Sequence, residues 1–242
     1  MKEHNLEEKL GKLQADIDLF SYVASHDLHN PVGAILERCN SLTAHCSNSS
    51  DEATLEQIKS IAYEANNMNK LLDAIMDYMR VDSGSGKKRP FSSKESLDRA
   101  LDSLSEIMSA SNAEISIPDE MPEIYGRRIQ FSKVFLNLIE NAIKFCSRGE
   151  KPKISINVED KDNFWEFTVS DNGIGVAEEG RDIIFMLFQK EEKARGYPSI
   201  GSGLAIAKKI IEFHGGEMWL DTSYEGGSSF HFTVPKNQEE SA

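Results

Sequence analysis

Apolar side chains recur at helical spacing over the first part of the chain. The spacing alternates between four and three residues, at Leu6, Leu10, Leu13, Ile17, Phe20 and Ala24. This alternation is typical of the seam of a coiled coil or a helix bundle. The pattern predicts a first helix that begins near Leu6 and continues through Leu42.

A second helical pattern follows a polar break at Ser47 to Asp51, whose Ser, Asn and Asp residues suit a loop and a helix N-cap. Its apolar positions are Leu55, Ile58, Ala62, Ala65, Met68, Leu72, Ile75 and Met79. Two long helices joined by a short loop form a hairpin whose apolar face has no partner within the chain. A homodimeric four-helix bundle is the simplest way to bury that face.

The pattern changes after Val81 to Pro90, a stretch of small, charged and flexible residues that reads as a linker. Beyond it we expect helices at 96–109, 128–145 and 202–214, and strands at 114–117, 153–159, 164–170, 217–222 and 228–234. Helices and strands mixed in this way predict a two-layer α/β sandwich. The expected domains are a helical hairpin at 1–84, an α/β domain at 85–236 and a polar tail at 237–242.

Charge narrows the class of partner. The 242 residues carry a formal net charge of −13, which argues against nucleic acid or an anionic lipid surface as the main partner. A partner with a basic patch, or a phosphate reached through Mg²⁺, fits this charge better.

Cysteine usage and hydropathy predict a location. The three cysteines, Cys39, Cys46 and Cys146, have no paired spacing, and no leader-like segment opens the chain, which predicts a reducing cytoplasm. No apolar run approaches the roughly 20 residues that span a bilayer. We therefore expect a cytoplasmic chain, either by itself or as the cytoplasmic core of a longer sensor protein.

The sequence SHDLHNP places a reactive side chain beside a proline inside the first predicted helix. His26 falls nearly opposite the apolar stripe and faces solvent, and Pro31 frees the carbonyl of Asp27 at a cost of about 3 kcal/mol. A carboxylate that holds one ring N–H of an imidazole leaves the other nitrogen as a nucleophile. Asp27 would then orient His26 as a phosphoryl acceptor. A solvated surface His–Asp pair is the ordinary alternative.

Three polar residues share one face of a later predicted helix. Asn137, Asn141 and Lys144 are spaced by four and three residues, so two amides and an ammonium group project together. Amide oxygens are suitable Mg²⁺ ligands, and an ammonium group suits phosphate. An ordinary amphipathic helix explains this spacing about equally well. The chain contains neither a P-loop nor a Rossmann glycine fingerprint.

Two glycine-bearing segments follow. Asp171, Gly173 and Gly175 form a D-x-G-x-G turn after an apolar strand, and glycines there permit close backbone approach. The segment that contains Gly201, Gly203 and Leu204 opens a helix, where free N–H groups suit phosphate. Between these segments lies Phe185-Met-Leu-Phe188, which we expect to pack in the core or under a mobile lid.

Together these segments resemble the sensor histidine kinases of two-component systems. SHDLHNP is similar to their phosphoacceptor box, and the later segments resemble, in order, the N, G1, F and G2 boxes of the ATPase superfamily shared with gyrase, Hsp90 and MutL. The run from Tyr197 to Gly216 looks closest to the phytochrome-like branch. The resemblance covers nearly the whole chain from His26 onward.

The resemblance implies a role for each matching residue. His26 would be phosphorylated, and Asn30 would position a water that hydrolyses a partner's phosphoaspartate. Asn141 would be the Mg²⁺ ligand, assisted by Asn137. The remaining roles concern ATP: Lys144 would contact phosphate, Asp171 would accept a hydrogen bond from the adenine amino group, and Gly173, Gly175, Gly201 and Gly203 would let the backbone close around the nucleotide.

The implied activity is autophosphorylation of a homodimer at His26 from Mg²⁺-ATP, with transfer to an Asp of a response-regulator receiver domain. One departure is Ser199, where the family has the first glycine of the G2 box. If that position needs positive φ or very close approach to phosphate, Ser199 slows turnover or loosens ATP binding. Two alternatives stay open: a dimeric phosphotransfer scaffold with weak or lost autokinase activity, and a mechanochemical ATPase of the gyrase or Hsp90 type.

Overall fold

The computed structural model describes residues 32–43, 52–83, 86–147, 149–197 and 199–236. The chain divides into two compact units, Met1–Ser83 and Gly84–Ala242, and each is considered by itself. His26, Asp27 and Asn30 lie outside the described residues, as do the first predicted helix up to Pro31 and the break at Ser47 to Asp51.

The first unit is helical. Residues 32–43 form a helix, and α2 (Glu52–Ser83) follows. Val32 and Cys39 on the first helix and Ile58 and Ala65 on α2 are buried. Several large apolar side chains remain exposed in the single chain, namely Ile35, Leu42, Ile61, Tyr63, Met68 and Leu71. An apolar face of this extent without cover is what a bundle-forming hairpin presents.

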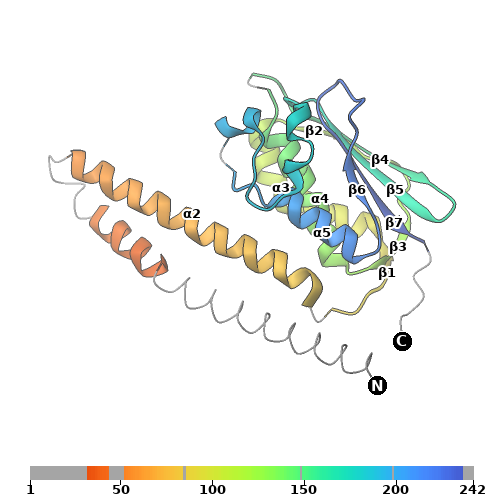
Figure 1. The fold of residues 1–242 in the computed structure, drawn as a ribbon, viewed down its shortest axis with the longest axis horizontal. Coiled ribbons are helices and arrows are strands. Elements are labelled where there is room, and N and C mark those ends of the chain that lie inside the picture. Colours follow the sequence, from red (N-terminus) through yellow and green to blue (C-terminus); the bar gives the residue numbers. More distant parts are fainter. Residues whose placement is uncertain (1–31, 44–51, 84–85, 148, 198, 237–242) are drawn as a thin grey trace. The chain divides into compact units, whose positions relative to one another are not determined.

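The second unit is a two-layer α/β structure. Its main sheet has the strand order β2-β4-β5-β7-β6. The strands are β2 (Glu114–Ser116), β4 (Lys153–Asp160), β5 (Phe164–Asp171), β6 (Met218–Leu220) and β7 (Ser229–Pro235). Only the β2–β4 pair is parallel among these. The helices α3 (Ser93–Ser111), α4 (Arg128–Lys144) and α5 (Gly203–Phe213) cover one face of the sheet (Figure 1). This arrangement confirms the predicted fold class.

Alternation along β5, and along β7 from Phe230 onward, separates the two faces of the sheet. Phe167 and Val169 on β5, and Phe232 on β7, are buried beneath the helices. The rings of Phe167 and Phe232 stack with centroids 4.9 Å apart, and Phe135 of α4 meets both edge-on. Because side chains alternate along a strand, the residues between them face away from the helices.

The predicted linker at Val81 to Pro90 is wrong at both ends. α2 runs to Ser83, and a strand, β1 (Arg89–Ser92), begins before Pro90. β1 pairs antiparallel with β3 (Glu123–Gly126), which the sequence did not predict either. Proline is tolerated at the edge of a sheet because no ladder hydrogen bond is required there, so its presence did not exclude a strand.

In the second unit, the other predicted helices and strands exist, with ends displaced by a few residues. The largest shift there is at α3, which begins at Ser93 and ends at Ser111, followed by Asn112 as a left-handed cap with φ of 52°. Within the described residues, no helix is both long and apolar enough to span a membrane.

Candidate nucleotide site

Asp171 ends β5 with its side chain on the helix-covered face of the sheet. It is only 7% exposed. Its Oδ1 accepts hydrogen bonds from the backbone N–H groups of Gly173 at 2.8 Å and Ser228 at 3.0 Å. No hydrogen bond from the described residues reaches Oδ2. Burial raises the pKa of Asp171 above its usual value, although the two backbone hydrogen bonds act in the opposite direction.

Glycines make the close approach around Asp171 possible. A Cβ on Gly173 would lie 2.7 Å from the carbonyl oxygen of Phe145, and Gly175 has φ of 66°. Gly227 has φ of 146°, and a Cβ there would lie 2.2 Å from the Asp171 carbonyl oxygen. Only glycine can adopt these backbone angles while a neighbouring backbone lies this close.

Sequence reasoning missed Gly227 and Ser228. Both lie just before β7, and Ser228 both donates to the Asp171 carboxylate and accepts from the Asp171 N–H, at 2.8 Å. The available signal was the Gly226-Gly227-Ser228-Ser229 run at the start of an apolar strand. A double glycine at that point indicates a backbone that turns sharply or passes close to a neighbour.

The three polar residues of α4 have different environments. Asn137 is buried, and its Nδ2 has no hydrogen-bond partner among the described residues. Asn141 and Lys144 are half-buried, and Lys144 lies 3.6 Å from the Glu140 carboxylate. The Asn137 amide nitrogen is therefore available to a ligand that supplies an acceptor.

The glycine-rich segment meets α4 at the start of α5. A Cβ on Gly203 would lie 3.4 Å from Oδ1 of Asn137. Ser202 precedes the helix and makes no side-chain cap hydrogen bond, so the first-turn N–H groups are open to an anion. Leu204, the second residue of α5, is half-buried. The Asn137 amide and a helix N-terminus therefore converge.

Gly201 is tied to the Phe185–Phe188 segment. Its φ is 77°, and its carbonyl accepts the N–H of Phe188 at 2.8 Å. Phe188 itself has φ of 65°, an uncommon value for a residue with a side chain. The Phe185 ring lies edge-on to Phe230, with centroids 6.3 Å apart. Phe185 is thus half-buried against the sheet.

Three short 3₁₀ turns lie between the two glycine segments: η1 (Glu178–Gly180), η2 (Ile183–Phe185) and η3 (Glu192–Gly196). Tyr197 follows them and packs edge-on against Phe145 at the end of α4, with centroids 5.3 Å apart.

Ser199 follows this segment and is half-exposed. Among the described residues, only Asn112 and Phe188 combine a side chain with positive φ, so Ser199 does not require a glycine's conformation. A need for positive φ therefore gives no reason to expect slower turnover or weaker ATP binding from Ser199, which leaves close approach to phosphate as the remaining reason.

The site can accommodate three chemical groups. Asp171 presents a buried acceptor, the start of α5 and Lys144 suit phosphate, and the Asn137 and Asn141 amides supply oxygen ligands. No cluster of three or more His, Cys, Asp or Glu residues that could hold a metal occurs in the described part of the chain. A cation here would depend on amide oxygens together with the phosphates of its ligand, which is how Mg²⁺ commonly binds beside nucleotides.

Two family models match the chain. Residues 16–84 match the His Kinase A (phospho-acceptor) domain. Residues 126–238 match the histidine kinase-, DNA gyrase B-, and HSP90-like ATPase. Every residue of the nucleotide site described above lies within the second match.

Relatives and solved structures agree with these models. The phytochrome-like protein Cph1 of Synechocystis is 36% identical over 231 residues, which cover 95% of this chain and 30% of that protein. The cyanobacterial phytochrome A of Nostoc is 34% identical over 230 residues, with the same coverage of both chains. This chain thus spans about three tenths of the length of the curated relatives it matches.

Two solved structures have the same fold. Full-length ShkA in complex with AMPPNP has a TM-score of 0.66 at 20% identity, over 90% of this chain and 46% of that one. Histidine kinase ThkA in complex with response regulator protein TrrA has a TM-score of 0.61 at 22% identity, over 98% and 67% of the chains. From its two matched domains and its relatives, the chain belongs to the sensor histidine kinases, in their phytochrome-like branch.

Proposed function

We propose that this protein is an ATP-dependent protein histidine kinase that phosphorylates its own His26. The observation that carries the proposal is the nucleotide site itself, in which Asp171 and Asn137 each keep a polar atom without a partner among the described residues. The site follows a phosphoacceptor-domain match on the same chain. A donor site and an acceptor domain together define phosphoryl transfer from ATP.

Each residue of the site has a role in this proposal. Asp171 accepts a hydrogen bond from the adenine amino group through its free Oδ2. The N–H groups at the start of α5 and the Lys144 ammonium group bind the phosphates. Asn141, with Asn137 beside it, holds Mg²⁺. When bound, Mg²⁺ neutralises the phosphate charge that develops during transfer.

The acceptor chemistry rests on His26 and Asp27. A ring nitrogen of His26 attacks the γ-phosphorus, a nitrogen–phosphorus bond forms, and the bond between that phosphorus and the oxygen bridging it to ADP breaks. Asp27 holds the other ring nitrogen and stabilises the positive charge that the imidazole acquires. In-line positioning supplies most of the rate enhancement in such transfers.

The same proposal includes the domain limits and the assembly. Residues 1–84 would form the dimerisation and phosphotransfer hairpin, 85–236 the catalytic domain, and 237–242 a tail. The exposed apolar side chains of the first unit support a homodimeric four-helix bundle, because a second copy would cover them.

A response-regulator receiver domain is the partner we propose for phosphohistidine. The solved structure of ThkA contains the response regulator TrrA, and this chain shares its fold over 98% of its length. The phosphoryl group would pass from His26 to an Asp of the receiver. Asn30 would position the water that later hydrolyses the phosphoaspartate.

The test is incubation with Mg²⁺ and γ-labelled ATP, with wild type beside His26→Ala and His29→Ala. His29 lies in the same motif and serves as the matched control. We expect acid-labile, alkali-stable label on wild type and on His29→Ala, and none on His26→Ala. Free phosphate without retained label would indicate an ATPase of the gyrase or Hsp90 type. ATP binding without label or turnover would favour the phosphotransfer scaffold.

A further inference from the structure

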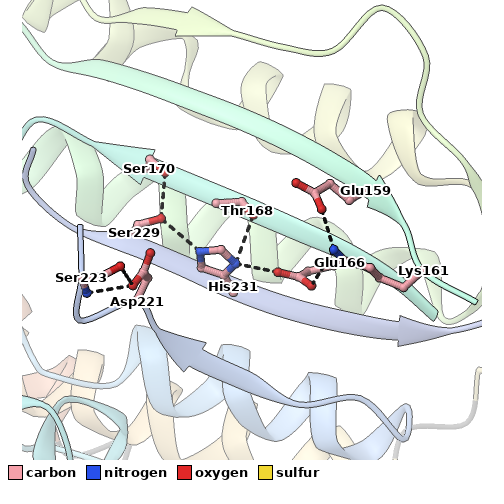
Figure 2. A network of polar contacts seen from close by, with 9 residues as sticks. All are labelled: Glu159, Lys161, Glu166, Thr168, Ser170, Asp221, Ser223, Ser229 and His231. Carbon is pink, nitrogen blue, oxygen red and sulfur yellow. Dashed lines mark hydrogen bonds and ion pairs between the residues drawn. The ribbon is translucent and has the colours of Figure 1, made fainter. Parts of the chain in front are cut away.

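A second polar cluster lies on the face of the sheet away from the helices (Figure 2). We call it the outer-face network: Ser170, Ser229, His231, Thr168 and Glu166. Ser170 Oγ and Ser229 Oγ are 2.8 Å apart, and Ser229 Oγ lies 3.3 Å from His231 Nε2. His231 Nδ1 lies 2.9 Å from Glu166 Oε1 and 3.2 Å from Thr168 Oγ1. The hydrogen bonds thus form one continuous chain.

The network joins β5 to β7 at successive register positions. Ser170 is paired with Ser229 and Thr168 with His231 across the two strands. Trp219 of β6 stacks on the His231 ring, with centroids 5.3 Å apart and planes 20° from parallel. Ser229 is only 3% exposed although it faces away from the helices. The network is therefore packed and bonded like an interior, on the uncovered face of the sheet.

One pattern of proton positions satisfies the whole chain of hydrogen bonds. Nδ1–H of His231 donates to Glu166, Ser229 donates to Nε2, and Ser170 donates to Ser229. Each of these three contacts thus has a donor and an acceptor, and the network forms a continuous chain of hydrogen bonds.

The network lies directly behind the carboxylate of the nucleotide site. Ser170 precedes Asp171, and Ser229 follows Ser228, so each pair presents one residue to each face of the sheet. On the other face, Ser228 and Asp171 exchange two hydrogen bonds, of 2.8 and 3.0 Å. The Ser170–Ser229 contact therefore clamps the two strands at the point where they hold Asp171.

We propose that Ser170, Ser229 and His231 are positioning residues for nucleotide selection. They hold β5 against β7 so that Oδ2 of Asp171 faces the exocyclic group of the base. Adenine presents an amino donor at this point and guanine presents a carbonyl acceptor, so the position of the carboxylate decides the preference for ATP over GTP. The inference rests on the proposed adenine contact of Asp171.

The appropriate readout is the ratio of GTP to ATP dissociation constants. A loss of stability alone would weaken both nucleotides in parallel, whereas a displaced carboxylate weakens ATP selectively. We would measure both constants for wild type, Ser229→Ala and Ser170→Ala by calorimetry, with the folded fraction checked by circular dichroism. Two alanine variants guard against one failing to fold.

Two control variants separate position from stability. Asn157→Ala changes the same sheet face one strand away, where its amide bonds only to Ser155 Oγ in the described structure, at 3.2 Å. Ser96→Ala removes a buried hydroxyl of α3 that donates to the Arg128 carbonyl at 3.0 Å, a contact between two helices and not between strands of the sheet. The first controls for surface polarity, and the second controls for a comparable loss of stability.

We expect Ser229→Ala and Ser170→Ala to lower the GTP-to-ATP ratio about three- to tenfold, the size expected for a weakened hydrogen bond to a charged group. Neither control variant should change this ratio. An unchanged ratio in both variants, or an equal change in Ser96→Ala, would overturn the inference. If wild type itself binds no ATP, the proposed function fails instead. If wild type binds ATP and GTP equally, the adenine contact of Asp171 fails.

Discussion

The two faces of the sheet carry equally polar clusters at the same pair of strands, and they differ in one respect. On the helix-covered face, Asp171 Oδ2 and Asn137 Nδ2 have no partner within the described residues. On the other face, the outer-face network forms an unbroken chain of hydrogen bonds. Leaving a buried polar atom unpaired costs about 1–3 kcal/mol, which a ligand that pairs it would recover. A cluster of polar side chains therefore does not by itself indicate a binding site.

A third cluster, around His214, is also closed. His214 is buried; its Nδ1 donates to the Ile210 carbonyl at 2.8 Å, and its Nε2 accepts the Arg127 N–H at 3.1 Å. Burial lowers the pKa of His214 to about 4 despite the hydrogen bond to Ile210, and the charges of Lys88 and Arg127 act in the same direction as burial. We call a cluster closed when its hydrogen bonds form a continuous set, and open when it keeps an unpaired polar atom. Substitutions in a closed cluster should change stability, whereas substitutions in the open cluster around Asp171 should change nucleotide binding.

The largest expected effect comes from a backbone change beside Asp171, in the open cluster. Gly227→Ala places a Cβ 2.2 Å from the Asp171 carbonyl oxygen at φ of 146°. We expect a loss of at least about 3 kcal/mol in the free energy of unfolding, measured by urea denaturation. Gly196→Ala is the matched control, because a Cβ there meets nothing within 4 Å. Equal stability of the two variants would show that the backbone around Asp171 is not constrained as described.

The next effect tests the closed cluster at His214. Its pKa is about 4 in the folded chain and near 6.5 when unfolded, so the unfolded chain binds the extra proton between these values. Stability should therefore be complete above pH 6.5 and fall by about 3 kcal/mol as the pH drops to 4. His214→Gln should lose this part of the pH dependence in denaturation curves. An unaltered slope in the variant would assign it to other groups.

A smaller effect separates binding from stability at Asp171. Asp171→Asn retains Oδ1 for the two backbone N–H groups but replaces the free oxygen by an N–H donor. We expect ATP affinity to fall about 10- to 100-fold by calorimetry, with GTP affected less. Burial raises the pKa of Asp171, so its charge is a cost in the folded state, and we expect the neutral amide to lower the free energy of unfolding little. A large loss of stability with unchanged ATP affinity would make Asp171 structural.

The smallest expected effect concerns Ser199. Its backbone lies outside the left-handed region, so Ser199→Gly relieves no conformational strain. We expect the KM for ATP and the autophosphorylation rate to change less than about threefold, which is under 1 kcal/mol. A gain of tenfold or more would mean that the serine side chain obstructs the phosphates.

Much of this molecule was predictable because the relevant information is local. The apolar runs at 164–170 and 228–234 predicted two strands, and the four- and three-residue spacing of Asn137, Asn141 and Lys144 predicted one helix with a shared polar face. The same spacing did not predict that Asn137 is buried against the start of α5 while Lys144 lies beside Glu140. Which side of a helix meets which neighbour depends on packing between layers.

The sequence by itself determined the helical first region, the two-layer α/β class of the second and the helices and strands of its main sheet, and it singled out the residues from Asn137 to Leu204 as candidates. Only the tertiary structure decided that Gly227 and Ser228 complete the Asp171 site, that β1 pairs with β3, and that Ser170 meets Ser229 behind the carboxylate. These are contacts between segments far apart in the chain. Periodicity records which residues share a face, but the register of distant strands is set by how the aromatic core packs beneath them.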